Sequence, residues 1–329
     1  MPHDLPFLRP GQRIDEFVIL RPIASSGASE LYLARPAGRG NRRKHVASLL
    51  ERLCALPGRR GRGLAALKLA YPDCQANLHD EHAYLSRSEL RHPHLVDLYS
   101  HRYGRPGRRG PRDLGLARLS GDGRSDGSTI LYLALAFEPG PTVAHLLRQR
   151  RGRSLHPTLA AHIAYQTAQV LRHLHSHDLI HHDVKPANII LRPTRGIADV
   201  ALIDLGSAES LRAPRQRSIY GTRRYLPPER LTGSGPETLT PHIDVYGLGR
   251  TLEEMLTGAP EDRGGDPPHG IAVGQVGHQG ISAELARLVR DATAPCLAQR
   301  QRLVPTMQTF IERLEATPEF RWRRARARA

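Results

Sequence analysis

Residues 181–191 read HHDVKPANIIL, and this stretch decides the fold and the chemistry that we expect. Asp183 can accept the proton of a hydroxyl group, Lys185 can neutralise a phosphate, and the side-chain carbonyl of Asn188 can hold Mg²⁺. Lysine and asparagine each occur only three times in 329 residues. An Asp-x-Lys-x-x-Asn pattern therefore has a chance probability on the order of 10⁻³ in such a chain. The stretch indicates a loop for phosphoryl transfer.

Two further motifs follow this loop in the chain. ALIDLG (residues 201–206) places Asp204 directly after the β-like run 200–203, and IYGTRRYLPPER (219–230) contains Thr222 and Glu229. Taken alone, an Asp-Leu-Gly at the end of a strand is no better explained by a metal site than by a plain turn. Its short distance along the chain from Asn188 favours the metal site.

The order of the elements predicts an α+β fold with two lobes. Short β-like runs at 17–20, 31–34, 64–69, 94–99 and 129–137, with a helix at 80–90, predict a β-rich N-lobe over 14–138. Helical patterns at 159–174, 244–256, 281–297 and 306–314 predict an α-helical C-lobe over 139–315. We expect a cleft at 136–140, an N-terminal extension over 1–13, basic insertions at 35–63 and 101–128, a possible short helix at 45–56 and a basic tail over 316–329.

Over roughly residues 14–315, the motifs and their order resemble the eukaryotic-type serine/threonine protein kinases, including their bacterial members. The resemblance implies ATP as the phosphate donor, protein Ser/Thr hydroxyls as acceptors, Asp183 as the catalytic base, and Asp204 with Asn188 as Mg²⁺ ligands. Lys185 fits Ser/Thr rather than Tyr specificity. The family's arginine before the catalytic aspartate is His182 here, which argues against control by an activation-loop phosphate.

The resemblance also assigns supporting residues. It implies that Thr222 bonds near Asp183, that Glu229 anchors its segment by an ion pair, and that Asp244 braces the catalytic loop, with a helix N-cap as the less favoured alternative for Asp244. The usual arginine partner of Glu229 would fall near Val304. It is missing there, so Arg300 or Arg302 is expected to substitute. Autophosphorylation is possible at Ser207, Ser210, Ser218 and Thr222.

On the nucleotide side, Lys68 in LAALKLA (64–70) resembles the family's strand lysine that grips the ATP phosphates. It needs a carboxylate to hold it in place. We choose Glu81, because Leu85 one turn later supplies an inward apolar face. The family's usual spacing would select Ala83 instead, and Glu89 is the fallback.

The glycine-rich loop is the weakest match. Aligning IASSGASELYLA (23–34) with the family pattern places Ala24, Ser26 and Ser29 at the glycine positions, with Gly27 between them, which suggests weaker or slower nucleotide binding. The resemblance places adenine between Leu31, Ala66 and Ile190. Leu135 would limit the depth of the pocket, and the backbone of Ala136 to Glu138 would bond the adenine edge.

Bulk properties narrow the function classes. The formal charge of +16 comes from 45 arginines and 3 lysines spread along the chain, so composition bias explains it better than a nucleic-acid patch. Three scattered cysteines and an N-terminus without a secretory pattern favour reduced thiols in a cytoplasmic setting. The longest apolar run, 130–137, is too short to span a bilayer.

Several rival functions remain open. The histidines at 173, 175, 177, 181 and 182 could suggest a metal site, but positions i and i+2 of a helix point apart. A small-molecule kinase of the aminoglycoside or choline type shares the catalytic loop but generally lacks the 221–229 segment. A pseudokinase scaffold would fit His182 and the altered glycine loop. The sequence contains no recognisable partner motif and does not indicate the protein substrate or the oligomeric state. We expect that a separate protein could regulate the activity.

Overall fold

The computed structural model describes residues 8–26, 28–37, 63–103, 113–118, 129–150, 154–213, 221–232, 239–258 and 280–321. The chain divides into two compact units. The first comprises Met1–Arg91 and Val96–Pro139, and the second comprises His92–Leu95 and Gly140–Ala329. The possible helix at 45–56, Gly27 and Ser218 lie outside the described residues.

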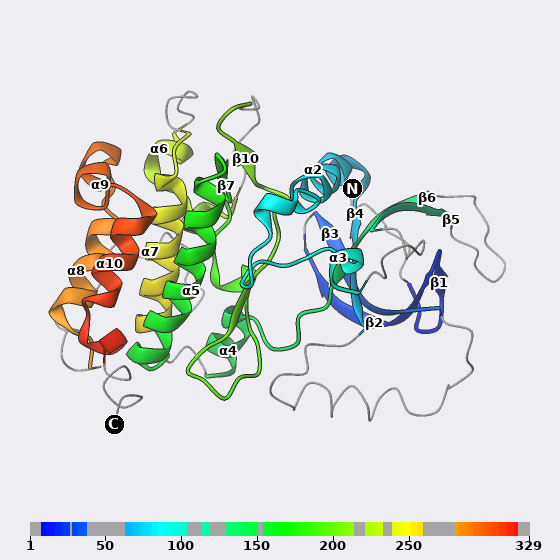
Figure 1. Ribbon diagram of the computed structural model, residues 1–329, viewed down its shortest axis with the longest axis horizontal. Coiled ribbons are helices and arrows are strands. Elements are labelled where there is room, and N and C mark those ends of the chain that lie inside the picture. Colours follow the sequence, from blue (N-terminus) through cyan, green and yellow to red (C-terminus); the bar gives the residue numbers. More distant parts are fainter. Residues whose placement is uncertain are drawn as a thin grey trace. The chain divides into compact units, whose positions relative to one another are not determined.

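The first unit is built on one antiparallel sheet. Among the described residues, its strand order is β1-β2-β3-β4-β6-β5, with bounds Arg13–Ile14, Phe17–Ser25, Ser29–Pro36, Ala65–Ala70, Thr129–Ala136 and Leu114–Arg118 in that order. Helix α2 (Gln75–Leu85) and the short helix α3 (Tyr99–Tyr103) complete this unit (Figure 1). The β-rich character predicted for the first half of the chain is confirmed.

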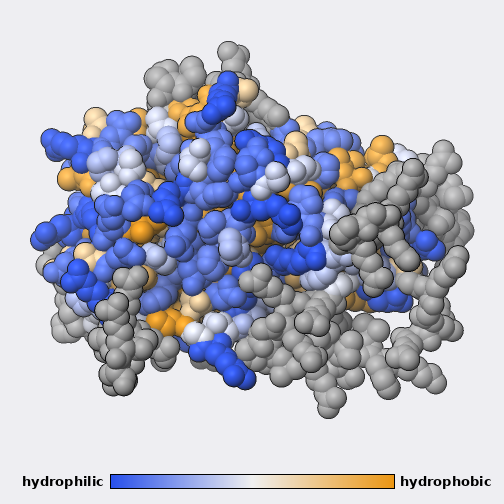
Figure 2. Space-filling view, in the orientation of Figure 1, coloured by the Kyte–Doolittle hydropathy of each residue, from blue (hydrophilic) through white to orange (hydrophobic). Residues whose placement is uncertain are grey.

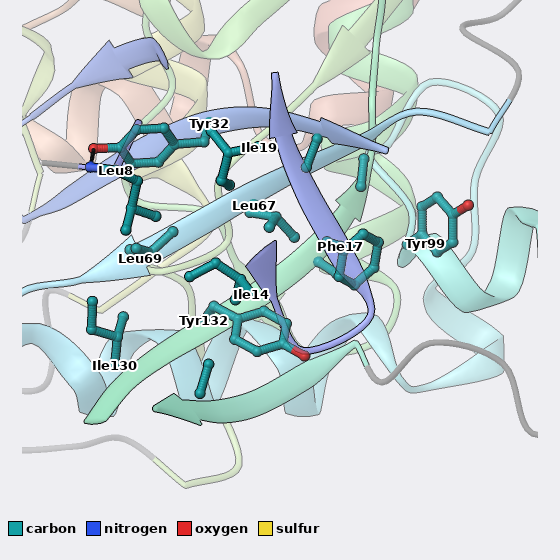
Figure 3. Packing of buried hydrophobic residues seen from close by; sticks show 14 residues of the cluster. Leu8, Ile14, Phe17, Ile19, Tyr32, Leu67, Leu69, Tyr99, Ile130 and Tyr132 are labelled. Atoms are coloured by element: carbon teal, nitrogen blue, oxygen red, sulfur yellow. Dashed lines mark hydrogen bonds between the residues drawn. The ribbon is translucent and has the colours of Figure 1, made fainter. Parts of the chain in front are cut away.

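One face of this sheet forms a hydrophobic core. Phe17 packs edge-to-face against Tyr99 and Tyr132, with ring centroids 5.3 and 6.3 Å apart (Figure 3). The Tyr132 hydroxyl donates to Asp15 at 2.9 Å. Leu8 is fully buried in the same cluster, and its backbone N–H donates to the Tyr32 hydroxyl at 3.3 Å. Residues from position 8 onward therefore belong to the sheet unit, although the sequence suggested an extension up to residue 13.

The second unit is mainly helical. Its helices are α4 (Val143–Gln149), α5 (Pro157–His175), α6 (Pro228–Leu231), α7 (His242–Thr257), α8 (Ala283–Ala292), α9 (Leu297–Leu303) and α10 (Met307–Glu315). In the described part of this unit, two small antiparallel pairs accompany them: β7 (Leu179–Ile180) with β10 (Glu209–Ser210), and β8 (Ile189–Leu191) with β9 (Val200–Leu202).

Helix α5 packs against α7 and α10 in the middle of this unit (Figure 1). Pro157 occupies its first turn, where a missing N–H does no harm, and Ile163, Val170 and Leu174 lie on its buried face, as the 3–4 residue spacing predicted. Phe320 stacks on His162 of α5 with ring centroids 4.7 Å apart. The packed unit thus extends beyond the boundary at 315 that the sequence suggested.

The segment His92–Leu95 is part of the second unit, although both of its chain neighbours belong to the first. The buried Arg192 donates to the carbonyl of Pro93 at 3.0 Å, and the N–H of Leu202 donates to the carbonyl of His94 at 2.7 Å. These bonds explain why four residues leave the sheet unit. They also correct the strand predicted at 94–99, where only single bridges form at Leu95 and Leu98.

Three other predicted boundaries are wrong. The helix predicted at 80–90 runs from Gln75 to Leu85 and is followed by a 3₁₀ turn, Ser88–Leu90. The helix predicted at 281–297 is α8, which ends at Ala292, and a separate helix, α9, begins at Leu297. The stretch 101–128, predicted as an insertion, contributes strand β5.

The described surface in Figure 2 is largely hydrophilic. Leu116 on β5, 66% exposed, is the one strongly exposed large hydrophobic side chain among the described residues. None of the described helices combines the length and the apolar character that crossing a bilayer requires.

Candidate active site

Three residues of the second unit converge on the carboxyl group of Asp183. Its Oδ1 accepts hydrogen bonds from the backbone N–H and the hydroxyl of Thr222, both at 3.0 Å. Its Oδ2 accepts one from Asn188 Nδ2 at 3.0 Å and lies 2.6 Å from Lys185 Nζ. Lys185 Nζ also donates to the Thr222 hydroxyl at 2.7 Å. A nearly buried carboxylate is thus held in one orientation by partners from two separate segments.

Asn188 and Asp204 are brought together by the β8–β9 pair. The N–H of Ile203, next to Asp204 in the chain, donates to the carbonyl of Asn188 at 2.9 Å. Asn188 Nδ2 donates to both the backbone carbonyl and the carboxylate of Asp183, at 2.8 and 3.0 Å, so the amide oxygen is the atom that can serve a cation. Asp204 has a φ of 72°, and its Oδ1 accepts the Gly206 N–H at 3.1 Å. An amide oxygen and a carboxylate form the kind of oxygen set that Mg²⁺ uses together with phosphate ligands.

Asp244, at the start of α7, supports the loop from beneath. Its carboxylate accepts the backbone N–H groups of His181 and His182, both at 2.9 Å, and His175 Nε2 lies 2.8 Å away. Burial alone would raise the pKa of Asp244, but the hydrogen bond and charge of His175, with those of His181, outweigh it and lower the pKa. The carboxylate therefore stays ionised and makes tertiary contacts rather than a simple helix cap.

The segment around Thr222 is fixed at both ends. Gly221 has a φ of 106°, and a Cβ there would lie 2.8 Å from the carbonyl oxygen of His182, so only glycine brings this segment against the loop without strain. Glu229 forms an ion pair with the fully buried Arg300. Of the two arginines that the sequence left open, the structure uses Arg300. Its guanidinium also donates to the carbonyl of Ala294 at 2.6 Å and lies over the Tyr246 ring.

In the first unit, Lys68 on β4 pairs with Glu81 on α2 at 2.7 Å. The Glu81 side chain is fully buried, whereas Glu89 is exposed and pairs with Arg87 at 2.9 Å. Of the three positions weighed in the sequence, the structure joins Glu81 to Lys68 and leaves Ala83 and Glu89 apart from it.

Lys68 shares one face of the sheet with the residues expected around adenine. Leu31 is directly opposite Lys68 in the β3–β4 register, and Ala66 is opposite Leu135 in the β4–β6 register. Because side chains alternate along a strand, these four lie on the face opposite to the hydrophobic core. Ile190 is on β8 of the second unit.

In the segment 136–138, two of the backbone N–H groups that were expected to bond adenine are already hydrogen-bonded within the first unit. The N–H of Ala136 donates to the carbonyl of Asp97 at 2.9 Å, and the N–H of Phe137 donates to that of Leu64 at 3.1 Å, so neither donor can bond an adenine edge. The buried Glu138 pairs with Arg102 at 2.5 Å, a contact that the sequence did not predict. For the other backbone groups of this segment, the role at the adenine edge stays a prediction.

The loop between β2 and β3 is closed by a side chain. Ser26 Oγ accepts the N–H groups of Ala28 and Ser29 at 3.3 and 3.1 Å. The Ser26 N–H donates to the carbonyl of Ser29 at 2.9 Å. Ala24 pairs with Leu31 at the end of β2. The hydroxyl therefore engages two of the backbone donors that a phosphate would need.

His182 is almost completely buried, and neither ring nitrogen has a hydrogen-bond partner among the residues that the structure describes. Its Nε2 lies 3.6 Å from Glu209 on β10. Burial, with the nearby charges of Arg230 and His181, lowers the pKa of His182 to about 4, although Asp244 and Asp183 act in the opposite direction. The ring is neutral at physiological pH and offers no charge to a phosphate.

The other histidines of the sequence cluster do not converge. The His173 ring packs against His92 and His177, with centroids 5.4 and 4.7 Å apart, while His175 bonds to Asp244. No group of three or more His, Cys, Asp or Glu side chains in the described ranges is placed to hold a metal ion. The role of His175 was missed in the sequence, because nothing in a helical pattern shows which residue faces a distant carboxylate.

A family model described as the protein kinase domain matches residues 66–312, about three quarters of the chain. The chain belongs to the protein kinase family.

Its curated relatives include serine/threonine-protein kinases from bacteria. PknB of Mycobacterium leprae is 28% identical over 240 residues, which cover 69% of this chain and 34% of PknB. PkaA of Streptomyces coelicolor is 35% identical over 161 residues, which cover 48% of this chain and 28% of PkaA. The matches thus span about a third of the length of these relatives.

The kinase domain of PknI from Mycobacterium tuberculosis has a similar solved structure. The match has a TM-score of 0.58 at 21% identity and covers 94% of this chain and 99% of that domain. A double mutant of the same domain gives a TM-score of 0.60 at 20% identity, covering 94% and 98%. The two-lobed protein-kinase fold predicted from the sequence is confirmed.

Proposed function

We propose that this protein kinase domain transfers the γ-phosphate of ATP to serine or threonine hydroxyls of protein substrates. The observation that carries the proposal is the convergence of Thr222, Lys185 and Asn188 on the carboxylate of Asp183. These contacts orient one acid–base group and place one cation beside it, which positioned phosphoryl transfer requires.

In this proposal Asp183 orients the substrate hydroxyl and takes its proton as the oxygen attacks the γ-phosphorus. Lys185, 2.6 Å from Asp183, neutralises charge on the transferred group. Thr222 holds the same carboxylate from the substrate side and links it to the segment that Glu229 and Arg300 anchor. The brace from Asp244 keeps the backbone of the loop in register.

The donor set fits ATP with Mg²⁺. Lys68, held by the buried Glu81, would bind the α- and β-phosphates, and the adjoining face with Leu31, Ala66 and Leu135 offers an apolar surface for a purine. The amide oxygen of Asn188 and the carboxylate of Asp204 would hold Mg²⁺, which neutralises the phosphate charge when bound. Asp183 and Lys185 remain the groups that act on the hydroxyl and the transferred phosphate.

The test is transfer of labelled phosphate from ATP, with Mg²⁺, to the chain itself and to a mixture of test proteins. Asp183→Asn is expected to reduce transfer by at least about 10³-fold, because the acceptor for the proton is lost. Asp178→Asn is the matched control, because the Asp178 carboxylate is partly exposed and pairs with Arg212. Its φ of 57° is one that asparagine tolerates. Nucleotide binding without transfer by the wild type would contradict the proposal and favour a scaffold.

A further inference from the structure

Two consecutive arginines follow Thr222, in a 3₁₀ turn formed by Arg223–Tyr225. Their position relative to the acid–base group is fixed, because both the N–H and the hydroxyl of Thr222 bond to Asp183 at 3.0 Å. Arg223 directly follows Thr222 in the chain, and adjacent Cα atoms are about 3.8 Å apart. The backbone of Arg223 therefore lies close to Asp183.

The two arginines are in different situations. The Arg224 guanidinium lies 3.6 Å from Glu254 on α7, and Tyr225 donates to the same carboxylate at 2.6 Å. Arg223 is exposed, and its guanidinium has no ion pair or hydrogen bond with any described residue. Arg224 is therefore engaged within the fold, whereas Arg223 points its charge to solvent beside the reacting position.

Among the residues that the structure describes, the acidic side chains of this region do not offset this charge. Glu254 is engaged by Arg224 and Tyr225, Glu229 is paired with the buried Arg300, and Glu209 is largely buried beside His182. A substrate hydroxyl that reaches Asp183 thus brings its neighbouring residues close to an unneutralised guanidinium. Arginine favours carboxylates as partners because its planar fork matches their geometry.

We propose that Arg223 selects acceptor sequences in which an acidic residue lies directly beside the phosphorylated serine or threonine. This inference rests on the proposed function and names the substrate class: acidic rather than basic acceptor segments. An acid adjacent to the acceptor gains an ion pair with Arg223, and a lysine or arginine there meets repulsion.

The test uses three peptides that are identical except for the residues directly before and after one serine, which are both Glu, both Gln or both Lys. For the wild type, kcat/KM is expected to fall by about two- to fivefold from Glu to Gln and again from Gln to Lys, as exposed ion pairs allow. Arg223→Gln should remove most of the difference, and Arg223→Glu should reverse the order. Arg287→Glu, a charge reversal on the exposed face of α8, should keep the wild-type order.

A second measurement separates this inference from the proposed function. The same peptides with alanine in place of the serine, carrying a fluorescent label, are bound to each variant and followed by anisotropy. The order Glu, Gln, Lys in affinity, reversed in Arg223→Glu, supports the inference even where no phosphate is transferred, in which case only the proposed function fails. Equal binding of the three peptides, or the same order in the folded Arg223→Glu and Arg223→Gln variants, would overturn it.

Discussion

At the scale of single residues, His182 differs most from what the family leads one to expect. A buried neutral imidazole, whose nitrogens have no hydrogen-bond partner in the described ranges, stands where the family resemblance led us to expect an arginine. A phosphorylated residue could not form a charge-assisted bond with it at neutral pH. That this position does not sense an activation-loop phosphate stays a prediction, which the neutral ring supports.

The burial of His182 also predicts a pH effect on stability. Since the folded pKa is about 4 and an exposed histidine titrates near 6.5, the unfolded chain binds the extra proton between these values, and stability falls as pH drops through this window. Replacing His182 by Gln should reduce the loss between pH 7 and 4.5 by about 2 kcal/mol.

Urea unfolding of both proteins at pH 7 and pH 4.5 measures this effect. The exposed Gln149, at the end of α4, provides the control, because Gln149→Ala removes no titrating group and should leave the pH dependence unchanged. An equal pH dependence in the wild type and His182→Gln would contradict the lowered pKa.

The residue scale also shows what a single sequence can and cannot predict. The scarcity of lysine singled out Lys68 and Lys185, and motif spacing singled out Asp183, Asn188 and Asp204. The partners Glu81 and Arg300 were each one of several candidates, because which carboxylate or guanidinium reaches across a fold depends on tertiary packing. Residue spacing alone does not identify these partners. For Glu81, helix α2 also starts five residues earlier than its pattern suggested, which changes where each of its residues faces.

At the scale of elements, the turn between β2 and β3 is held by hydrogen bonds to the side chain of Ser26. Ser26 Oγ satisfies the N–H groups of Ala28 and Ser29, so a phosphate must displace the hydroxyl before it can bond to these donors. We therefore predict that Ser26→Ala binds a non-hydrolysable ATP analogue about two- to tenfold more tightly, the equivalent of about one hydrogen bond.

Titration calorimetry of both proteins tests this. Ser25→Ala, one residue earlier at the end of β2, serves as the control and should bind like the wild type. Weaker binding by Ser26→Ala would mean that the hydroxyl helps to hold the nucleotide or the loop.

The elements also differ in how well the sequence predicted them. Helices α5, α7 and α10 were predicted within a few residues, because each has a clear apolar stripe that it buries. Strand β5 was missed, because its Leu-Gly-Leu-Ala-Arg sequence sits between Gly/Arg-rich stretches and its pairing with β6 is a long-range choice. The strand expected at 94–99 failed because its first residues bond within the other unit.

At the scale of the whole molecule, the chain crosses from the sheet unit into the helical unit for the four residues His92–Leu95 and then returns. The hydrophobic pattern of the sequence could not predict this crossing, because hydrogen bonds from Arg192, a polar side chain, hold it. Arg192 Nη1 donates to the carbonyl of Pro93, to Asp199 and to the carbonyl of Val200, at 3.0, 3.0 and 2.9 Å. A buried guanidinium with three acceptors gives this crossing a defined position.

Removing the anchor should therefore loosen the crossing segment before it unfolds the helical unit. In Arg192→Met, which keeps much of the side-chain volume, the loss of the hydrogen bonds to Pro93, Asp199 and Val200 should lower the free energy of unfolding by about 3 kcal/mol. Amide hydrogen exchange should accelerate most at Leu202, whose N–H donates to His94, and at Leu95, whose N–H donates to His92. Arg195→Met, an exposed arginine three residues along, should leave both rates unchanged. If exchange at Leu95 and Leu202 is equally slow in Arg192→Met and in the wild type, the backbone β-bridge between these two residues holds the crossing, and the arginine does not.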